Sequence, residues 1–235
     1  EILPDWHLYA TPPQVVFQGG PVGRDSALAL AARVGDHGDA EEPLGFRHVH
    51  AGIGLVDLDA PAELIAGYGA IRQRVTSALP LLFAVKPSAT FEIRAVETFR
   101  APSEAAASYM SGTADGKRPG VFYVNTHDLA SRPKYLMEAI YLHEAEPGHH
   151  MQDAIAQEAT GLPRFRRFAY DTAYDEGWAL YAESLGHDLG LYTDPYGAFG
   201  ALSSEMWRAV RLVVDTGIHS KGWTREQALD YFRAN

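Results

Sequence analysis

The sequence predicts a mainly helical α+β domain with a small β-sheet, and three observations support this prediction. Apolar residues recur every three or four positions over residues 61–79, two strand-like segments follow, and from about Lys134 onward nearly every stretch has a helical pattern. The 235 residues suit one large domain or two small ones. We therefore divide the chain into a segment over residues 1–60 that is poorly readable and one folded domain over residues 61–235.

Composition and charge exclude several classes of protein. Hydrophobic residues make up 46% and charged residues 21%, as in ordinary globular proteins, and the absence of cysteine excludes a disulfide scaffold. The net charge of −10 argues against nucleic acid as a partner. No uninterrupted apolar run reaches the length of a membrane span and no targeting segment is visible, so we expect a soluble protein, either cytoplasmic or exported. Oligomeric state has no sequence signal.

The N-terminal half contains few regular elements. Ser26 to Arg33 reads as a helix, whereas Gly52-Ile53-Gly54 lacks the third glycine of a nucleotide-binding loop. A second helix is predicted over residues 61–79, with one apolar face formed by Leu64, Ile65, Tyr68, Ile71 and Val75.

Two strands should come next. The segment from Phe91 to Val96 alternates apolar and polar side chains, and Val121 to Asn125 is a second strand-like run. Between them, Pro102 and Ser103 begin a short helical segment and residues 112–120 form a turn-rich loop.

The C-terminal half reads as a series of helices separated by glycine and proline. Breaks are expected at Pro147-Gly148, at residues 161–163, at residues 193–195 and over residues 217–222. Thr224 followed by Gln227 predicts a capping box at the start of the last helix. The chain stops inside that helix at Asn235, and we expect further sequence downstream.

One short segment concentrates groups that bind metal. Residues 143–150 contain three histidines and two glutamates. Neutral imidazole is a common zinc ligand, and a glutamate directly after a ligand histidine places a base beside a metal-bound water in helical metallohydrolases. The pair His143-Glu144 has this form.

The second histidine of the motif is displaced from its usual position. In the pattern His-Glu-x-x-His the histidines lie one helical turn apart, but Pro147 occupies that place here. Pro147-Gly148 can break the helix and return a later histidine toward His143. Either His149 or His150 could then be the second ligand, and the Gly-His order favours His149.

A third ligand is expected from another helix. Residues 174–183 carry Glu176 and Glu183, which lie seven positions apart and hence on one helical face. Glu176 suits a metal ligand, and Glu183 suits an acid that orients a ligand histidine.

Three motifs together resemble one family. They are His-Glu-x-x-Pro-Gly-His-His from His143, Glu-Gly-Trp-Ala-Leu-Tyr-Ala-Glu from Glu176, and the run from Val214 to Ala228. Together they are similar to the bacterial domain-of-unknown-function 885 family, which is placed with the zincin-like metallopeptidases. The resemblance covers residues 88–235. Because members are usually longer at both ends, it implies a zincin-like catalytic domain that is incomplete at both ends.

The resemblance also implies a gluzincin-type site, similar to those of thimet-oligopeptidase-like and Taq-carboxypeptidase-like enzymes. It implies one Zn²⁺ ion held by His143, His149 and Glu176, with Glu144 as the base. The expected activity is zinc-dependent cleavage of peptide bonds, with short peptides as substrates.

Further residues are expected around that site. His219 is a candidate donor to the developing oxyanion, with Asp215 fixing its tautomer. Tyr123 and Asn125 are candidate substrate contacts, on the expectation that their strand is the sheet edge that pairs with an extended peptide. Arg211 is a candidate for binding a substrate carboxylate.

The sequence leaves two other functions open. A metal-binding protein of the same fold without peptidase activity is the main alternative. A di-iron carboxylate protein is suggested by Glu146-x-x-His149, but no second Glu-x-x-His occurs in the sequence.

Overall fold

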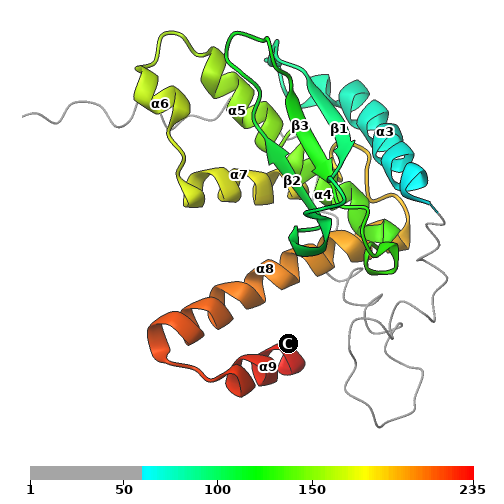
Figure 1. Ribbon diagram of the computed structural model, residues 1–235, viewed down its shortest axis with the longest axis vertical. Coiled ribbons are helices and arrows are strands. Elements are labelled where there is room, and N and C mark those ends of the chain that lie inside the picture. The colour runs from blue at the N-terminus through cyan, green and yellow to red at the C-terminus, as the bar shows by residue number, and fades with distance from the viewer. Residues whose placement is uncertain (1–59) are drawn as a thin grey trace, which may run out of the picture.

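The computed structural model describes residues 60–235 and consists of a three-stranded sheet covered and extended by helices (Figure 1). The prediction of a mostly helical domain with a small sheet is confirmed. The predicted helix from Ser26 to Arg33 and the Gly52–Gly54 segment lie outside the described residues.

The first described helix matches its predicted apolar pattern. Helix α3 spans Pro61–Ala78, and its buried residues Leu64, Tyr68, Ile71 and Val75 are four of the five expected from the sequence. A 3₁₀ turn, η2 at Leu79–Leu81, follows it. The buried face of α3 packs on the sheet and on helix α4, so this helix forms one wall of the main core.

The sheet has the order β1-β3-β2, with β1 at Phe91–Ala95, β2 at Ala107–Met110 and β3 at Gly120–Val124. Strand β3 pairs in parallel with β1 and antiparallel with β2, and all five of its residues are buried. The prediction that β3 is an edge strand is therefore wrong. Strand β2 is the antiparallel edge, and the sequence prediction missed it because its four residues do not alternate between apolar and polar.

Short elements lead from the sheet into the helical part. The 3₁₀ turns are η3 at Ala101–Ser103, η4 at Leu129–Ser131 and η5 at Lys134–Leu136. Four helices follow, and they are α4 at Met137–Glu144, α5 at His149–Glu158, α6 at Arg164–Phe168 and α7 at Thr172–Ser184. Helix α4 lies at the centre, because Tyr141 and Leu142 are fully buried between the sheet, α3 and α7.

The last two helices form a hairpin. Helix α8 spans Pro195–Lys221 and is capped by Asp194, whose side chain accepts hydrogen bonds from two backbone N–H groups. Helix α9 spans Arg225–Ala234 and carries the predicted capping box of Thr224 and Gln227. Figure 1 shows α8 leaving the body of the domain and α9 folding back toward it.

The predicted break over residues 217–222 is shorter than expected. Helix α8 continues through Gly217 to Lys221, and Gly222 ends it with φ of 69°. Gly217 is needed for packing, since a Cβ there would meet the indole ring of Trp223.

Candidate metal centre

The chain folds back sharply between α4 and α5. Helix α4 ends at Glu144 and α5 begins at His149, so the break falls at the predicted Pro147-Gly148. A Cβ at Gly148 would lie less than 3.0 Å from the carbonyl oxygens of Leu142 and His143. Only glycine allows the backbone to approach the end of α4 this closely. Trp178 of α7 fixes the loop by donating a 2.8 Å hydrogen bond to the Pro147 carbonyl.

The fold-back brings His149 beside His143. The centroids of the two rings lie 4.8 Å apart. Nε2 of His143 lies 3.3 Å from Oε2 of Glu176, and Nε2 of His149 lies 3.7 Å from Oε1 of the same residue. One ligand atom from each residue lies within 4.8 Å of the others. Atoms that bind one tetrahedral zinc ion at about 2.1 Å lie about 3.4 Å apart. The three side chains therefore fit a single ion with small adjustments.

His150 faces a different environment. It is 1% exposed, its Nδ1 lies 2.9 Å from the hydroxyl of Tyr109, and its ring packs 4.5 Å from that of Phe91. Burial, followed by the nearby Arg72 cation, lowers the pKa of His150 to about 4. This histidine is thus a neutral core residue, and His149 is the one that joins the cluster.

Glu183 orients His143 from behind. Nδ1 of His143 lies 2.7 Å from Oε1 of Glu183 and 3.0 Å from Nη2 of Arg208. Arg208 also lies 2.8 Å from the same carboxylate oxygen. We assign the proton of His143 to Nδ1, because this lets imidazole and guanidinium both donate to Glu183 and leaves the lone pair of Nε2 on the side of Glu176.

Glu144 lies next to the cluster on the last turn of α4. Burial, and to a smaller extent the charge of Glu176, raises the pKa of Glu144 to about 7, although His143, Arg208 and the backbone N–H of Tyr109 act in the opposite direction. A carboxyl group with this pKa can accept and release a proton near neutral pH. Burial and the neighbouring His143 likewise lower the pKa of His149, which favours the neutral form that binds metal.

Three predicted site residues lie away from the cluster. His219 is in the last turn of α8, eleven residues beyond Arg208, which is about 16 Å along the helix axis. Its side chain is 75% exposed, and its Nε2 lies 3.6 Å from Asp215. Arg211 is also exposed on α8. The structure therefore does not bring His219 to Glu144, because the C-terminal part of α8 runs away from the body of the domain (Figure 1).

The two residues proposed as substrate contacts on β3 are enclosed. Tyr123 is buried in a small cluster with Val96, Ala101 and Val121. Asn125 is fully buried, donates hydrogen bonds to the carbonyls of Ala101 and Glu104, and accepts one from the backbone of His127. The geometry gives Asn125 a structural role, since its amide is fully used by the backbone.

Comparison with known proteins identifies the family. Residues 25–235 match the family described as "Bacterial protein of unknown function (DUF885)". The chain belongs to this family. The crystal structure of "the putative lipoprotein from Colwellia psychrerythraea" is 34% identical with a TM-score of 0.77, over 88% of this chain and 37% of that one. The predicted membership of the DUF885 family is thus confirmed.

Shorter similarities link this DUF885 protein to a second group. A UPF0301 protein of Streptomyces coelicolor is 55% identical over 73 residues, covering 31% of this chain and 38% of that protein. A UPF0301 protein of Thermobifida fusca is 43% identical over 81 residues, again covering 38% of its length. The chain thus spans less than two-fifths of these relatives and of the Colwellia protein. Between residues 60 and 235, no helix has both the length and the hydrophobicity to cross a bilayer.

Two polar residues of this DUF885 site were not predicted from the sequence. Ser204 of α8 donates a 2.7 Å hydrogen bond to Oε2 of Glu183, and Arg208 in turn contacts the Ser204 hydroxyl at 3.1 Å. A signal was present, because Gly197, Gly200, Ala201 and Ser204 form a stripe of small residues that continues to Arg208. Such a stripe predicts close packing of α8, and a buried Glu183 requires a cation.

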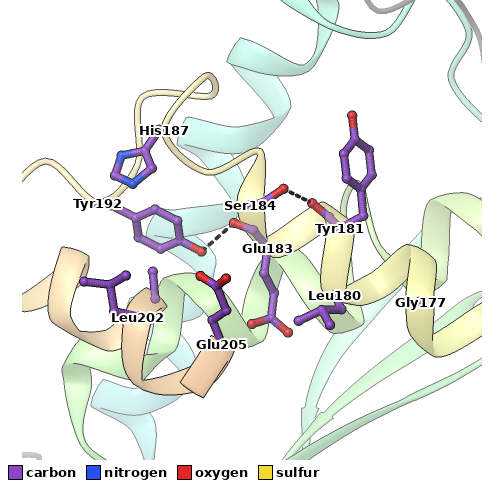
Figure 2. A pocket seen from close by; sticks show the side chains of 10 residues that line it. Gly177, Leu180, Tyr181, Glu183, Ser184, His187, Tyr192, Leu202 and Glu205 are labelled. Carbon is purple, nitrogen blue, oxygen red and sulfur yellow. Dashed lines mark hydrogen bonds between the residues drawn. The ribbon is translucent and has the colours of Figure 1, made fainter. Parts of the chain in front are cut away.

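A cavity lies behind Glu183. It measures about 420 Å³ between α7 and α8, and its lining includes Leu180, Tyr181, Tyr192, Leu202 and Glu205. Figure 2 shows Tyr192 reaching across it to the backbone carbonyl of Glu183, a hydrogen bond of 3.0 Å. Because Glu183 separates this cavity from His143, the cavity is not part of the metal cluster.

Proposed function

We propose that this protein is a zinc-dependent hydrolase that cleaves peptide bonds in short peptides. The single observation that carries the proposal is the convergence of His143, His149 and Glu176 beside a partly buried Glu144. Two neutral imidazoles and one carboxylate suit zinc, and three protein ligands leave a fourth position for water or substrate.

His143, His149 and Glu176 would hold the ion. When bound, zinc supplies a Lewis acid that polarises a carbonyl oxygen and acidifies a coordinated water. Glu183 and Arg208 support this role from behind His143, since they keep its proton on Nδ1 and its Nε2 available as a ligand.

Glu144 would act as the proton carrier of the reaction. Its raised pKa lets the carboxylate take a proton from the attacking water and deliver it to the amine that leaves. Helix α4, which ends at Glu144, packs against β2. Strand β2 is a sheet edge, and an extended peptide paired along it would pass the cluster.

The test begins with the metal. The purified chain should bind one zinc ion per molecule, and a chelator should abolish digestion of a peptide library that added zinc restores. Glu144→Gln should keep the zinc and lower kcat by about a thousandfold or more, since it removes the proton carrier alone. Glu205→Gln is the matched control and should retain activity.

Two outcomes distinguish the proposal from its alternative. If the wild-type chain binds zinc but digests no peptide, and Glu144→Gln behaves identically, the protein is a metal-binding member of the fold. A chain that takes up no zinc would overturn both functions.

A further inference from the structure

Exposed aromatic side chains follow one another along the chain from α6 to the start of α7, the helix that carries Glu176. Phe165 and Phe168 of α6, Tyr170 between the helices and Tyr174 in the first turn of α7 are 72, 49, 69 and 68% exposed. Large aromatic side chains are seldom left in water on this scale without a partner. We call these four residues, together with Arg164 and Arg166, the arginine–aromatic rim.

The rim is basic within an acidic protein. Three of the four residues from Arg164 to Arg167 are arginines, and no acidic residue lies between Glu158 and Asp171, although the whole chain has a net charge of −10. Arg164 and Arg166 are exposed, and the guanidinium of Arg164 lies over the ring of Phe168. The charge of this surface is complementary to an anionic partner.

The rim reaches the metal centre itself. The hydroxyl of Tyr170 lies 3.4 Å from Oε1 of Glu176, the oxygen that also faces His149. Phe168 is two residues earlier in the chain, so its Cα lies within about 7 Å of that of Tyr170. A peptide positioned at the cluster and extended by a few residues would therefore cross the rim.

We propose that the arginine–aromatic rim selects peptides that carry an acidic side chain a few residues from the scissile bond. This inference rests on the proposed peptidase function. The arginines bind the carboxylate, since a planar guanidinium matches it with two parallel hydrogen bonds. The aromatic rings cover the apolar parts of the peptide.

A peptide fits the rim better than an anionic bilayer does. The rim lies on a five-residue helix and on a turn that contacts a metal ligand, and this places its partner at the reaction site. A helix that binds in a membrane interface usually presents a longer apolar face. Binding to vesicles is therefore a competing outcome of the test.

The test compares quenched fluorescent peptides that differ only by Glu, Gln or Lys at one position, scanned along the peptide. For the wild type, kcat/KM should be about tenfold higher with Glu than with Gln at the preferred position, mainly because KM is lower. In 0.5 M salt this ratio should be smaller, because salt screens the attraction. The double variant Arg164→Gln, Arg166→Gln should bring this ratio to about one while binding zinc like wild type. The control Arg225→Gln, Arg233→Gln removes the same charge from α9 and should keep the ratio.

Each failure has a distinct meaning. The proposed role of the rim is wrong if neutral peptides are cleaved without a preference for Glu, or if the two double variants have equal effects. Neither result contradicts the proposed peptidase activity. If no peptide is cleaved, fluorescence anisotropy can measure binding of the Glu peptide to the Glu144→Gln chain. Tighter binding than that of the Gln peptide would support the proposed role of the rim, and equal binding would contradict it. Wild-type binding to phosphatidylglycerol vesicles that the Arg164→Gln, Arg166→Gln variant loses, with no peptide preference, would assign the surface to a membrane.

Discussion

Glu183 is the residue on which the orientation of His143 depends. Its carboxylate accepts from His143 and contacts Arg208 with one oxygen, and accepts from Ser204 with the other. Both carboxylate oxygens are thus used in a buried position, where an unpaired charge would be costly. Removing this charge would leave the Arg208 cation without its carboxylate partner close to the proposed metal site.

We therefore expect Glu183→Gln to weaken zinc binding by about ten- to a hundredfold, because neighbours that orient a ligand histidine contribute on this scale. The zinc Kd is measured by competition with a chelator of known affinity. Glu205→Gln, on the same cavity but outside the hydrogen-bond network, should leave the Kd unchanged. An unaltered Kd in Glu183→Gln would show that Glu183 does not orient His143.

Asn125 gives a second prediction at this scale. Because its side chain satisfies three backbone groups in a fully buried site, Asn125→Ala should lower the free energy of unfolding by about 2–3 kcal/mol. Urea denaturation measures this loss. The folded variant should retain the KM of wild type; a large rise in KM with little loss of stability would restore Asn125 as a substrate contact.

At the scale of elements, the turn from α4 to α5 determines whether the ligands can meet. Gly148 is packed against the carbonyls of Leu142 and His143, so Gly148→Ala must push the two helices apart. We expect a loss of about 3 kcal/mol in unfolding free energy and a severe loss of zinc binding.

Denaturation and metal analysis together check this expectation. Gly69→Ala in α3 is the matched control, since a Cβ there has open space and should stabilise the helix by about 0.5–1 kcal/mol. If Gly148→Ala bound zinc normally, the close approach at this turn would not be what positions His149.

The sequence predicts a helix or strand well where the residues of that segment alone show the apolar periodicity or the capping residues of the element. Helix α3 follows from its apolar face, and the start of α9 follows from Thr224 and Gln227. Strand β2 has no such signal, because it exists through pairing with β3. The same reason explains why His143, His149 and Glu176 could be predicted from motifs. Arg208 has only the indirect signal of the small-residue stripe on α8, because its contact depends on how α8 packs against α4.

For the whole molecule, several groups are buried at some cost in stability. Glu146 lies in the turn between His143 and His149, accepts a 3.2 Å hydrogen bond from Thr76, and is partly buried. Burial raises the pKa of Glu146 above its ordinary value of 4.5, although Thr76, Arg72 and Lys86 oppose the shift. The folded state therefore holds this proton more tightly than the unfolded chain does.

The contribution of Glu146 to the free energy of unfolding therefore falls as the pH rises from about 4.5, its ordinary pKa, through the raised pKa of the folded state. Glu146→Gln should match wild type near pH 4, where both side chains are neutral, and should be more stable at pH 8. Glu97 should show the opposite pH dependence of stability, because hydrogen bonding to Arg100 lowers its pKa. Glu97→Gln should therefore be less stable than wild type at pH 8 and equally stable in acid. Urea denaturation at both pH values measures these differences, and a Glu146→Gln variant that loses stability at pH 8 would show that the attraction of Arg72 and Lys86 outweighs the burial of Glu146.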